Sequence, residues 1–197
     1  MEHILQAVEK IMPEIIEIRR EIHRHPEIGR KEVRTTALIK EKLMEYGVDE
    51  IQSPMPTGAV ALIHGTGQGN AGLCAAVRAD IDALPVQEET GLPFSSQVPG
   101  MMHACGHDMH ASMLLGAAKI LCENRDKFSG TIKLIFQPSE DTLPGGAKEL
   151  VEKGNPEEMT DAQVAEIKAA KEKLMESAQK VFAKVYEQSQ GAQAGSQ

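Results

Sequence analysis

The segment HACGHDMHASMLLGAA, which runs from His103 to Ala118, constrains this chain more than any other part of its sequence. Three histidines, a cysteine and an aspartate fall within its first eight residues, although the whole chain of 197 residues contains 7 histidines and 3 cysteines. An apolar run with helical spacing follows at once. Because burying so many polar groups without a ligand is costly, the segment predicts a binding site at the start of a helix.

Composition and charge exclude several classes of protein. A hydrophobic fraction of 41% is typical of soluble globular chains. A net charge of -8 without a basic stripe argues against nucleic acid or an anionic membrane as the main partner. The sequence offers neither a secretory signal at its start nor a stretch long enough to span a bilayer. The chain has an odd number of cysteines, and these are widely spaced: Cys74, Cys105 and Cys122. This pattern argues against a disulfide framework and predicts a reducing compartment, and hence a cytoplasmic enzyme.

The chain divides into two parts of different composition, residues 1–154 and residues 155–197. The first part alternates helical and strand-like segments that are separated by glycine and proline. The second has no glycine between Gly154 and Gly191 and is rich in alanine, glutamate, lysine and glutamine. It predicts a long amphipathic helix with a disordered polar end, suited to self-association or packing on another surface.

Periodicity within the first part predicts both helices and strands. Apolar residues at helical spacing indicate a helix that ends before Pro13 and a second helix that Pro13 opens. Further helices are expected at residues 31–46, after His107 and at residues 145–154. Apolar runs indicate strands that begin near Ala59, Gly72 and Thr131, the first two joined by a turn. Strands separated by helices predict an α/β fold with a partly parallel sheet.

Acidic pairs follow two of the predicted strands. Asp80 and Asp82 come after the strand near residues 72–79, and Glu140 and Asp141 come after the strand near residues 131–136. Ligands of open α/β sheets collect at the carboxyl ends of strands, so we expect these turns to converge with the histidine-rich segment. Imidazole, thiolate and carboxylate groups together suit zinc-like divalent ions. Of two adjacent acids, one can bind metal while the other takes a proton.

Each of these residues also has a structural interpretation. Asp80 and Asp82 can cap the turn that follows their strand. Glu140 and Asp141 can be solvated loop acids, and a single cysteine such as Cys105 is more often a small buried hydrophobe than a ligand. The density of the histidine-rich segment is what favours a metal site over these alternatives.

Four segments carry a family resemblance when they are taken in order: HRHPEIG, RADIDALP, HACGHDMHASMLLGAA and FQPSED. They resemble the signature blocks of the amidohydrolase branch of the aminoacylase/carboxypeptidase metallopeptidases, which includes hippurate hydrolases, N-acyl-amino-acid amidohydrolases and auxin-conjugate hydrolases. The resemblance covers residues from about 15 to 154. It implies an incomplete three-layer α/β domain of the zinc-peptidase type, with a partly parallel sheet and helices on both faces, followed by the long helix.

The resemblance also implies a reaction and the residues that perform it. The reaction is hydrolysis of an amide bond in an N-acyl amino acid or a similar small conjugate by water activated at a metal. The complete family site holds two divalent ions, such as zinc, manganese, cobalt or nickel. The implied metal ligands are Cys105, His107 and Asp141, the last in place of the family's usual glutamate; Glu140 is the general base, and Asp82 supports the ligands.

Other residues of these segments are given structural roles. Asp80 is not assigned as a ligand, and His103, Asp108 and His110 are expected to shape the loop and the helix start. The histidines and glutamate of HRHPE are expected to organise the turn before the next helix.

The family draws two more histidine ligands from later segments, whereas no histidine follows His110 in this sequence. The alternative function is therefore a catalytically incomplete fragment or fusion, in which the C-terminal helix serves association. Within residues 155–197, the stretch AEIKAAKEKLMESAQKVFAKVYEQSQ with the Gln/Gly-rich end that follows it is similar to the carboxyl-terminal helical end of DnaK-type chaperones.

Overall fold

The computed structural model describes residues 2–154. These residues belong to a compact unit that spans Met1–Asn155, and Pro156–Gln197 form a second unit. The predicted long helix of residues 155–197 lies outside the described residues. Among the helices that are described, none is long and apolar enough to cross a bilayer.

The described residues form a four-stranded mixed sheet, which confirms the predicted partly parallel α/β fold. The strand order is β1-β2-β4-β3, and β3 and β4 are parallel whereas the other two pairings are antiparallel. The predicted strands near Ala59 and Gly72 both form, but β4 lies between them. Parallel strands need a long crossover, and helix α3 provides it between β3 and β4. The strands are β1 (Glu50–Gln52), β2 (Ala59–His64), β3 (Cys74–Asp80) and β4 (Thr131–Gln137).

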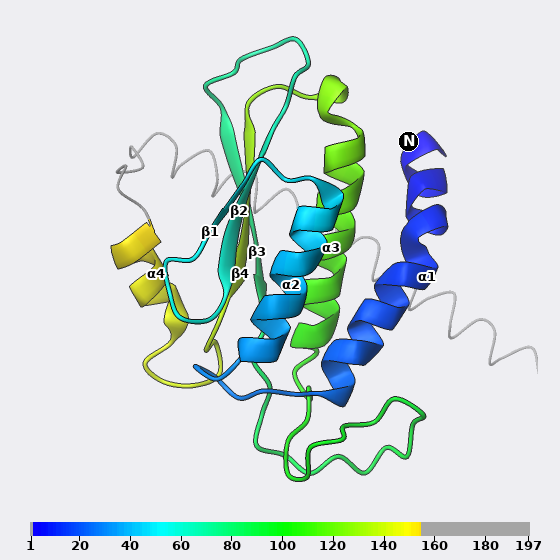
Figure 1. The fold of residues 1–197 in the computed structure, drawn as a ribbon, viewed down its shortest axis with the longest axis vertical. Helices are drawn as coiled ribbons and strands as arrows, with labels where there is room; N and C mark the ends of the chain where they lie inside the picture. The colour runs from blue at the N-terminus through cyan, green and yellow to red at the C-terminus, as the bar shows by residue number, and fades with distance from the viewer. Residues whose placement is uncertain (1, 155–197) are drawn as a thin grey trace, which may run out of the picture. The chain divides into compact units, whose positions relative to one another are not determined.

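Helices lie on both faces of this sheet, as the family resemblance implied. Figure 1 shows α2 and α3 against one face, α1 outside them and α4 on the opposite side. Helix α2 ends at Gly47, whose left-handed backbone (φ 77°) closes the last turn, as the sequence predicts. The helices are α1 (Glu2–Arg24), α2 (Val33–Tyr46), α3 (His107–Glu123) and α4 (Gly146–Gly154).

The predicted break at Pro13 is wrong, because α1 continues as one helix through this residue. One face of α1 carries the buried residues Ile11, Ile15, Ile18 and Ile22, spaced at helical intervals on both sides of the proline. This face packs on α3. The two helices approach closely at Gly116, where an added Cβ atom would lie 3.2 Å from Cγ1 of Ile15. Burial of a continuous apolar face outweighs the local cost of proline in the helix.

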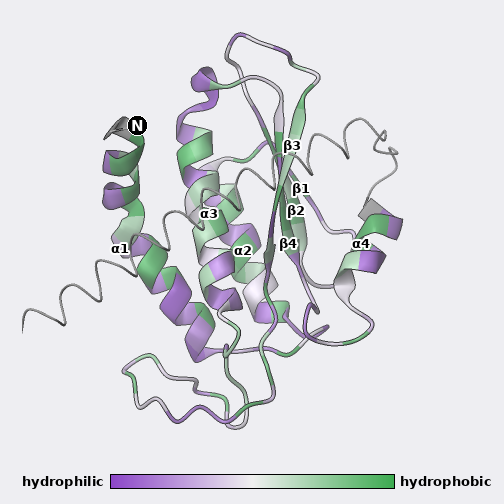
Figure 2. Ribbon diagram, turned by 180° about the vertical axis from the view of Figure 1, so that it is seen from behind, coloured by the Kyte–Doolittle hydropathy of each residue, from purple (hydrophilic) through white to green (hydrophobic). Residues whose placement is uncertain are grey.

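The hydrophobic core lies between the sheet and the helices on its α2–α3 side. Figure 2 shows mainly hydrophobic residues in the strands and alternating hydrophilic and hydrophobic residues along α1. Strand β3 is an edge strand within residues 2–154, and its residues 74–78 are exposed. Its last two residues, Ala79 and Asp80, are buried where the strand meets the start of α3. The three cysteines are free thiols.

Candidate metal centre

Three turns converge where β3 and β4 end. The two strands are parallel, so the acids that follow them lie at one edge of the sheet, beside the first turn of α3. There the thiol of Cys105, an imidazole nitrogen of His107 and a carboxylate oxygen of Asp141 lie within 4.8 Å of one another. The three residues that the sequence suggested as metal ligands are thus brought together.

His107 is the first residue of α3 and its ring is held by Asp82. Its Nδ1 atom lies 3.0 Å from the backbone carbonyl oxygen of Asp82 and 3.3 Å from Oδ1 of the same residue. A carbonyl oxygen only accepts hydrogen bonds, so Nδ1 carries a proton, and in the neutral ring Nε2 has the lone pair. A metal ligand needs such a lone pair, and Nε2 lies 3.9 Å from Oδ2 of Asp141, the next candidate ligand.

The burial and the neighbouring carboxylates of His107 determine its pKa. Burial lowers the pKa of His107, but the hydrogen bond with Asp82 and the charges of Asp80, Asp82 and Asp141 raise it more, so the net pKa lies above its ordinary value. A cation bound at Nε2 has to displace the proton that this environment favours.

Asp82 supports the site from behind. Its carboxylate is buried, and Oδ2 accepts the backbone N–H of Asp141 at 2.9 Å. Burial raises the pKa of Asp82, but hydrogen bonds from His107 and from the backbone of Glu140 and Asp141 outweigh it and lower the pKa below its ordinary value. Asp82 is therefore a carboxylate at neutral pH, in contact with one candidate ligand and with the backbone of another.

Cys105, Glu140 and Asp141 are exposed residues of the site, whereas His107 is buried. The desolvation of Cys105 and, after it, the contact with Asp141 and the charge of Glu140 raise the pKa of its thiol. A nearby cation is what allows a thiol in such an acidic setting to ionise at neutral pH. The side chain of Glu140 is 40% exposed, and its Oε2 lies 3.9 Å from Nε2 of His107. Glu140 is thus beside the candidate ligands and open to a substrate.

A second group of potential ligands was not predicted. Asp80, His107 and His110 also lie within ligand distance of one another, with Oδ1 of Asp80 2.7 Å from Nδ1 of His110. The two histidine rings stack with centroids 5.6 Å apart. Histidines three residues apart share one face of a helix, and this spacing in HDMH was the signal available in the sequence. Both groups use the same Nε2 atom of His107, so they are alternative environments for one donor.

A buried polar network lies next to the site. Asp108 is fully buried, and its Oδ2 lies 2.7 Å both from Nε of Arg19 and from Nδ1 of His23. Nε2 of His23 lies 3.3 Å from the buried carboxylate of Glu88. This network joins α1, the start of α3 and the loop that carries Glu88, which agrees with the structural role expected of Asp108. No sequence signal singled out Glu88.

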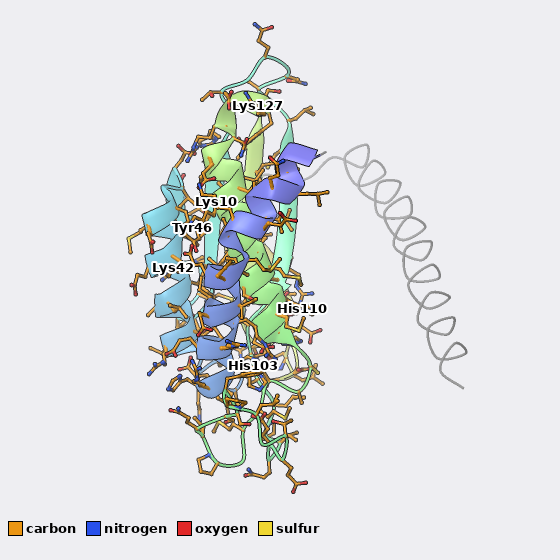
Figure 3. All side chains as sticks on the ribbon, turned by 90° about the vertical axis from the view of Figure 1, so that its right-hand side faces the viewer. Lys10, Lys42, Tyr46, His103, His110 and Lys127 are labelled. Atoms are coloured by element: carbon orange, nitrogen blue, oxygen red, sulfur yellow. The ribbon has the colours of Figure 1, made fainter. Side chains whose placement is uncertain are left out.

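His103 lies beside this network and is also buried. Neither of its ring nitrogens has a hydrogen-bond partner within residues 2–154. Burial, the largest effect, lowers the pKa of His103 to about 4. His103 and His110 both lie near the start of α3, at the same end of this helix (Figure 3).

Within the HRHPE segment, Glu27 organises the start of α2, as expected, whereas His23 belongs to the buried network with Asp108 and Glu88. The carboxylate of Glu27 accepts the backbone N–H groups of Arg34 and Thr35 at 3.0 and 2.8 Å. Nδ1 of His25 lies 3.1 Å from the backbone oxygen of Glu21 in the last turns of α1.

Comparison with known proteins agrees with this geometry. Residues 76–193 match the family model described as peptidase family M20/M25/M40. The chain is 48% identical over 156 residues to thermostable carboxypeptidase 1 of Saccharolobus solfataricus, covering 78% of this chain and 39% of that protein. It is 42% identical over 153 residues to the N-acyl-L-amino acid amidohydrolase of Geobacillus stearothermophilus, covering 78% of this chain and 40% of that protein.

A solved structure has the same fold. The Bacillus subtilis YXEP protein, described as a dinuclear metal binding peptidase from the M20 family, matches with a TM-score of 0.69 and 42% identity. The match covers 74% of this chain and 40% of that one. The chain thus spans about two fifths of the length of these relatives. The family resemblance inferred from four sequence segments is confirmed.

Proposed function

Because the chain belongs to peptidase family M20/M25/M40, we propose that it is a metal-dependent amidohydrolase for N-acyl amino acids or similar small amide conjugates. The observation that carries this proposal is the convergence of Cys105, His107 and Asp141 beside Glu140. The substrate class is supported by relatives named N-acyl-L-amino acid amidohydrolase and N-acetyl-L-cysteine deacetylase. Hippurate and auxin conjugates are members of the same substrate class.

The donor atoms fit a divalent ion of the zinc type. A thiolate, an imidazole nitrogen and a carboxylate oxygen are the ligands that such ions prefer, and the Asp82 contact fixes the required histidine tautomer. We propose that Cys105, His107 and Asp141 hold zinc, manganese, cobalt or nickel. The similar YXEP protein is described as dinuclear, which supports two ions in a complete site.

The proposed reaction assigns a separate task to each residue. The bound metal supplies a Lewis acid that polarises the amide carbonyl and makes water more acidic. Glu140 accepts the proton of the attacking water and delivers it to the leaving amine. Asp82 keeps the His107 ring in place and holds the backbone of Asp141. The free thiols support a reducing compartment, and we propose the cytoplasm as the location.

The second candidate function is metal binding without appreciable turnover. It is favoured by the composition of residues 111–197, which contain no histidine, whereas the family resemblance implies histidine ligands after His110. In this alternative, the predicted C-terminal helix serves association.

Metal content and turnover distinguish these two functions. Metal is measured by mass spectrometry after dialysis of the parent chain, of Cys105→Ala with His107→Ala, and of the control Cys74→Ala, whose thiol is exposed on β3. The parent and the control should retain metal and the double variant should lose it; equal metal in all three would remove these residues from the site. Hydrolysis of N-acetyl amino acids by the parent but not by Glu140→Gln supports the amidohydrolase, whereas metal binding without hydrolysis supports the second function.

A further inference from the structure

The turn that carries Glu140 and Asp141 has an uncommon backbone conformation. Ser139 is fully buried and has a φ angle of 55°, in the left-handed region that residues other than glycine rarely adopt. Such a conformation persists only where the surrounding structure fixes it. The contacts of Ser139 therefore determine how the next two residues are presented.

The principal contact of Ser139 is a buried glutamate that is distant in the sequence. Oε1 of Glu32 accepts the backbone N–H of Ser139 at 2.7 Å, and Oε2 accepts the hydroxyl of Thr57 at 2.8 Å. Glu32 is fully buried. It directly precedes α2, yet its side chain makes no capping bond to that helix. Both of its oxygens are thus used to hold other segments.

A second buried carboxylate holds the other end of the same turn. Oδ2 of Asp82 accepts the backbone N–H of Asp141, and the backbone N–H of Gly146 donates to the carbonyl of Ser139 at 2.8 Å. The amide groups on both sides of Glu140 are therefore fixed by carboxylates. Asp82 also contacts His107, so it belongs to the metal centre, whereas Glu32 touches none of the candidate ligands.

Close packing leaves this turn little alternative space. At Gly29, an added Cβ atom would lie 2.6 Å from Oγ1 of Thr142 and 2.9 Å from Oγ of Ser139. The loop between α1 and α2 is therefore pressed against the turn. Two polar residues of that loop bond to the backbone of the turn: Arg30 donates to the carbonyl of Pro144 at 3.1 Å, and Glu32 accepts the N–H of Ser139, next to Glu140.

We propose that Glu32 is a positioning residue of the metal centre. By holding Ser139 in its left-handed conformation, Glu32 directs Asp141 toward Cys105 and His107 and directs Glu140 toward the substrate. This inference rests on the proposed function, which takes Asp141 as a ligand and Glu140 as the base. Asp141 is one methylene shorter than the glutamate that the family resemblance implies, so its reach depends strongly on where the backbone places it.

Two substitutions at Glu32 separate positioning from simple packing. Glu32→Gln keeps both hydrogen bonds, because the amide oxygen can accept from Ser139 and the amide nitrogen can donate to the hydroxyl of Thr57. Glu32→Met has a similar length and removes both. Glu27→Ala is the matched control, since the carboxylate of Glu27 accepts the backbone N–H groups of Arg34 and Thr35 at the start of α2, and the substitution keeps the backbone bond of Glu27 to Ala83. Glu27→Ala should lower the stability of the fold but leave the hydrogen bonds of the turn at residues 139–146 in place.

Two readouts test the inference on the full chain. Hydrogen exchange without metal reports the protection of residues 139–146, and a Co²⁺ titration followed through the thiolate absorption band reports affinity at Cys105. Glu32→Met should speed exchange in this segment and weaken Co²⁺ binding about tenfold or more, as expected for loss of a residue that supports metal ligands. Glu32→Gln and Glu27→Ala should resemble the parent in both readouts.

The possible failures can be told apart. Parent-like exchange and parent-like Co²⁺ affinity in Glu32→Met would overturn the positioning role. A Co²⁺ spectrum that Cys105→Ala leaves unchanged would instead overturn the proposed metal centre. If Glu32→Met does not fold, Glu32→Asp takes its place, because the shorter carboxylate cannot reach both partners and should give the same changes in weaker form.

Discussion

Asp82 contacts the ring of His107 with two oxygens, its backbone carbonyl oxygen at 3.0 Å from Nδ1 and its carboxylate Oδ1 at 3.3 Å. The carbonyl contact survives substitution of the side chain, whereas the negative charge does not. Asp82→Asn should therefore keep the histidine tautomer but weaken divalent metal binding by about 10- to 100-fold, the usual effect of removing a partner of a ligand. Calorimetric titration with Zn²⁺ measures this change.

Asp126→Asn is the matched control for Asp82→Asn. Asp126 is exposed and is paired with Lys127 in the 3-10 turn after α3. Its substitution should leave Zn²⁺ affinity unchanged. Equal affinities for the parent and Asp82→Asn would contradict a supporting role for Asp82.

The two alternative environments of His107 lead to a second prediction. If the ion lies between Cys105, His107 and Asp141, Cys105→Ser should weaken Co²⁺ binding and remove the thiolate absorption band. His110→Ala should change the affinity little, since His110 belongs to the other group and is 48% exposed. Competition against a chelator gives both affinities. A larger loss for His110→Ala than for Cys105→Ser would place the ion beside Asp80.

Local sequence patterns predicted most of the fold. The strands near Ala59, Gly72 and Thr131 and the helices after Lys31 and His107 were recognisable because apolar spacing and glycine stops are local signals. The continuity of α1 through Pro13 was not, because it depends on packing against α3, a tertiary contact. Strand β1 was missed since three residues, of which none is fully buried, give no periodic signal.

The candidate site was predicted to a similar extent. Cys105, His107 and Asp141 were found through a dense motif and a family resemblance, and the structure brings them together. Glu32 was not found, because a single glutamate before a helix resembles an ordinary cap in the sequence. Its role depends on a hydrogen bond to a residue more than a hundred positions away, which local patterns cannot reveal.

Core packing between α3 and the sheet gives a third prediction. Leu115 is fully buried within the core cluster, and Leu115→Ala should lower the free energy of unfolding by about 2–5 kcal/mol. Met113, two residues earlier on the same helix, is 56% exposed, so Met113→Ala should change it by only about 0.5 kcal/mol. Urea denaturation measures both. Similar losses for the two variants would place the buried face of α3 elsewhere.

His103 leads to a prediction about pH. Burial lowers its pKa to about 4, from 6.5 for an ordinary histidine. The unfolded chain therefore binds more protons than the folded chain between these values, and the free energy of unfolding should fall as the pH decreases from about 6.5 toward 4. Above pH 6.5 the histidine is neutral in both states and this effect is absent. The expected loss from this residue is about 3 kcal/mol over the whole interval.

His103→Phe isolates this contribution, because phenylalanine has a ring of comparable size and does not titrate. Urea denaturation of the parent and the variant at pH 7 and pH 5, with a chelator to remove metal, gives the change in stability for each. Other histidines and carboxylates titrate in both proteins, so their effects cancel in the comparison. The parent should lose more stability than His103→Phe between these two pH values. Equal losses would mean that His103 has an ordinary pKa in the folded protein and is not buried as the structure places it.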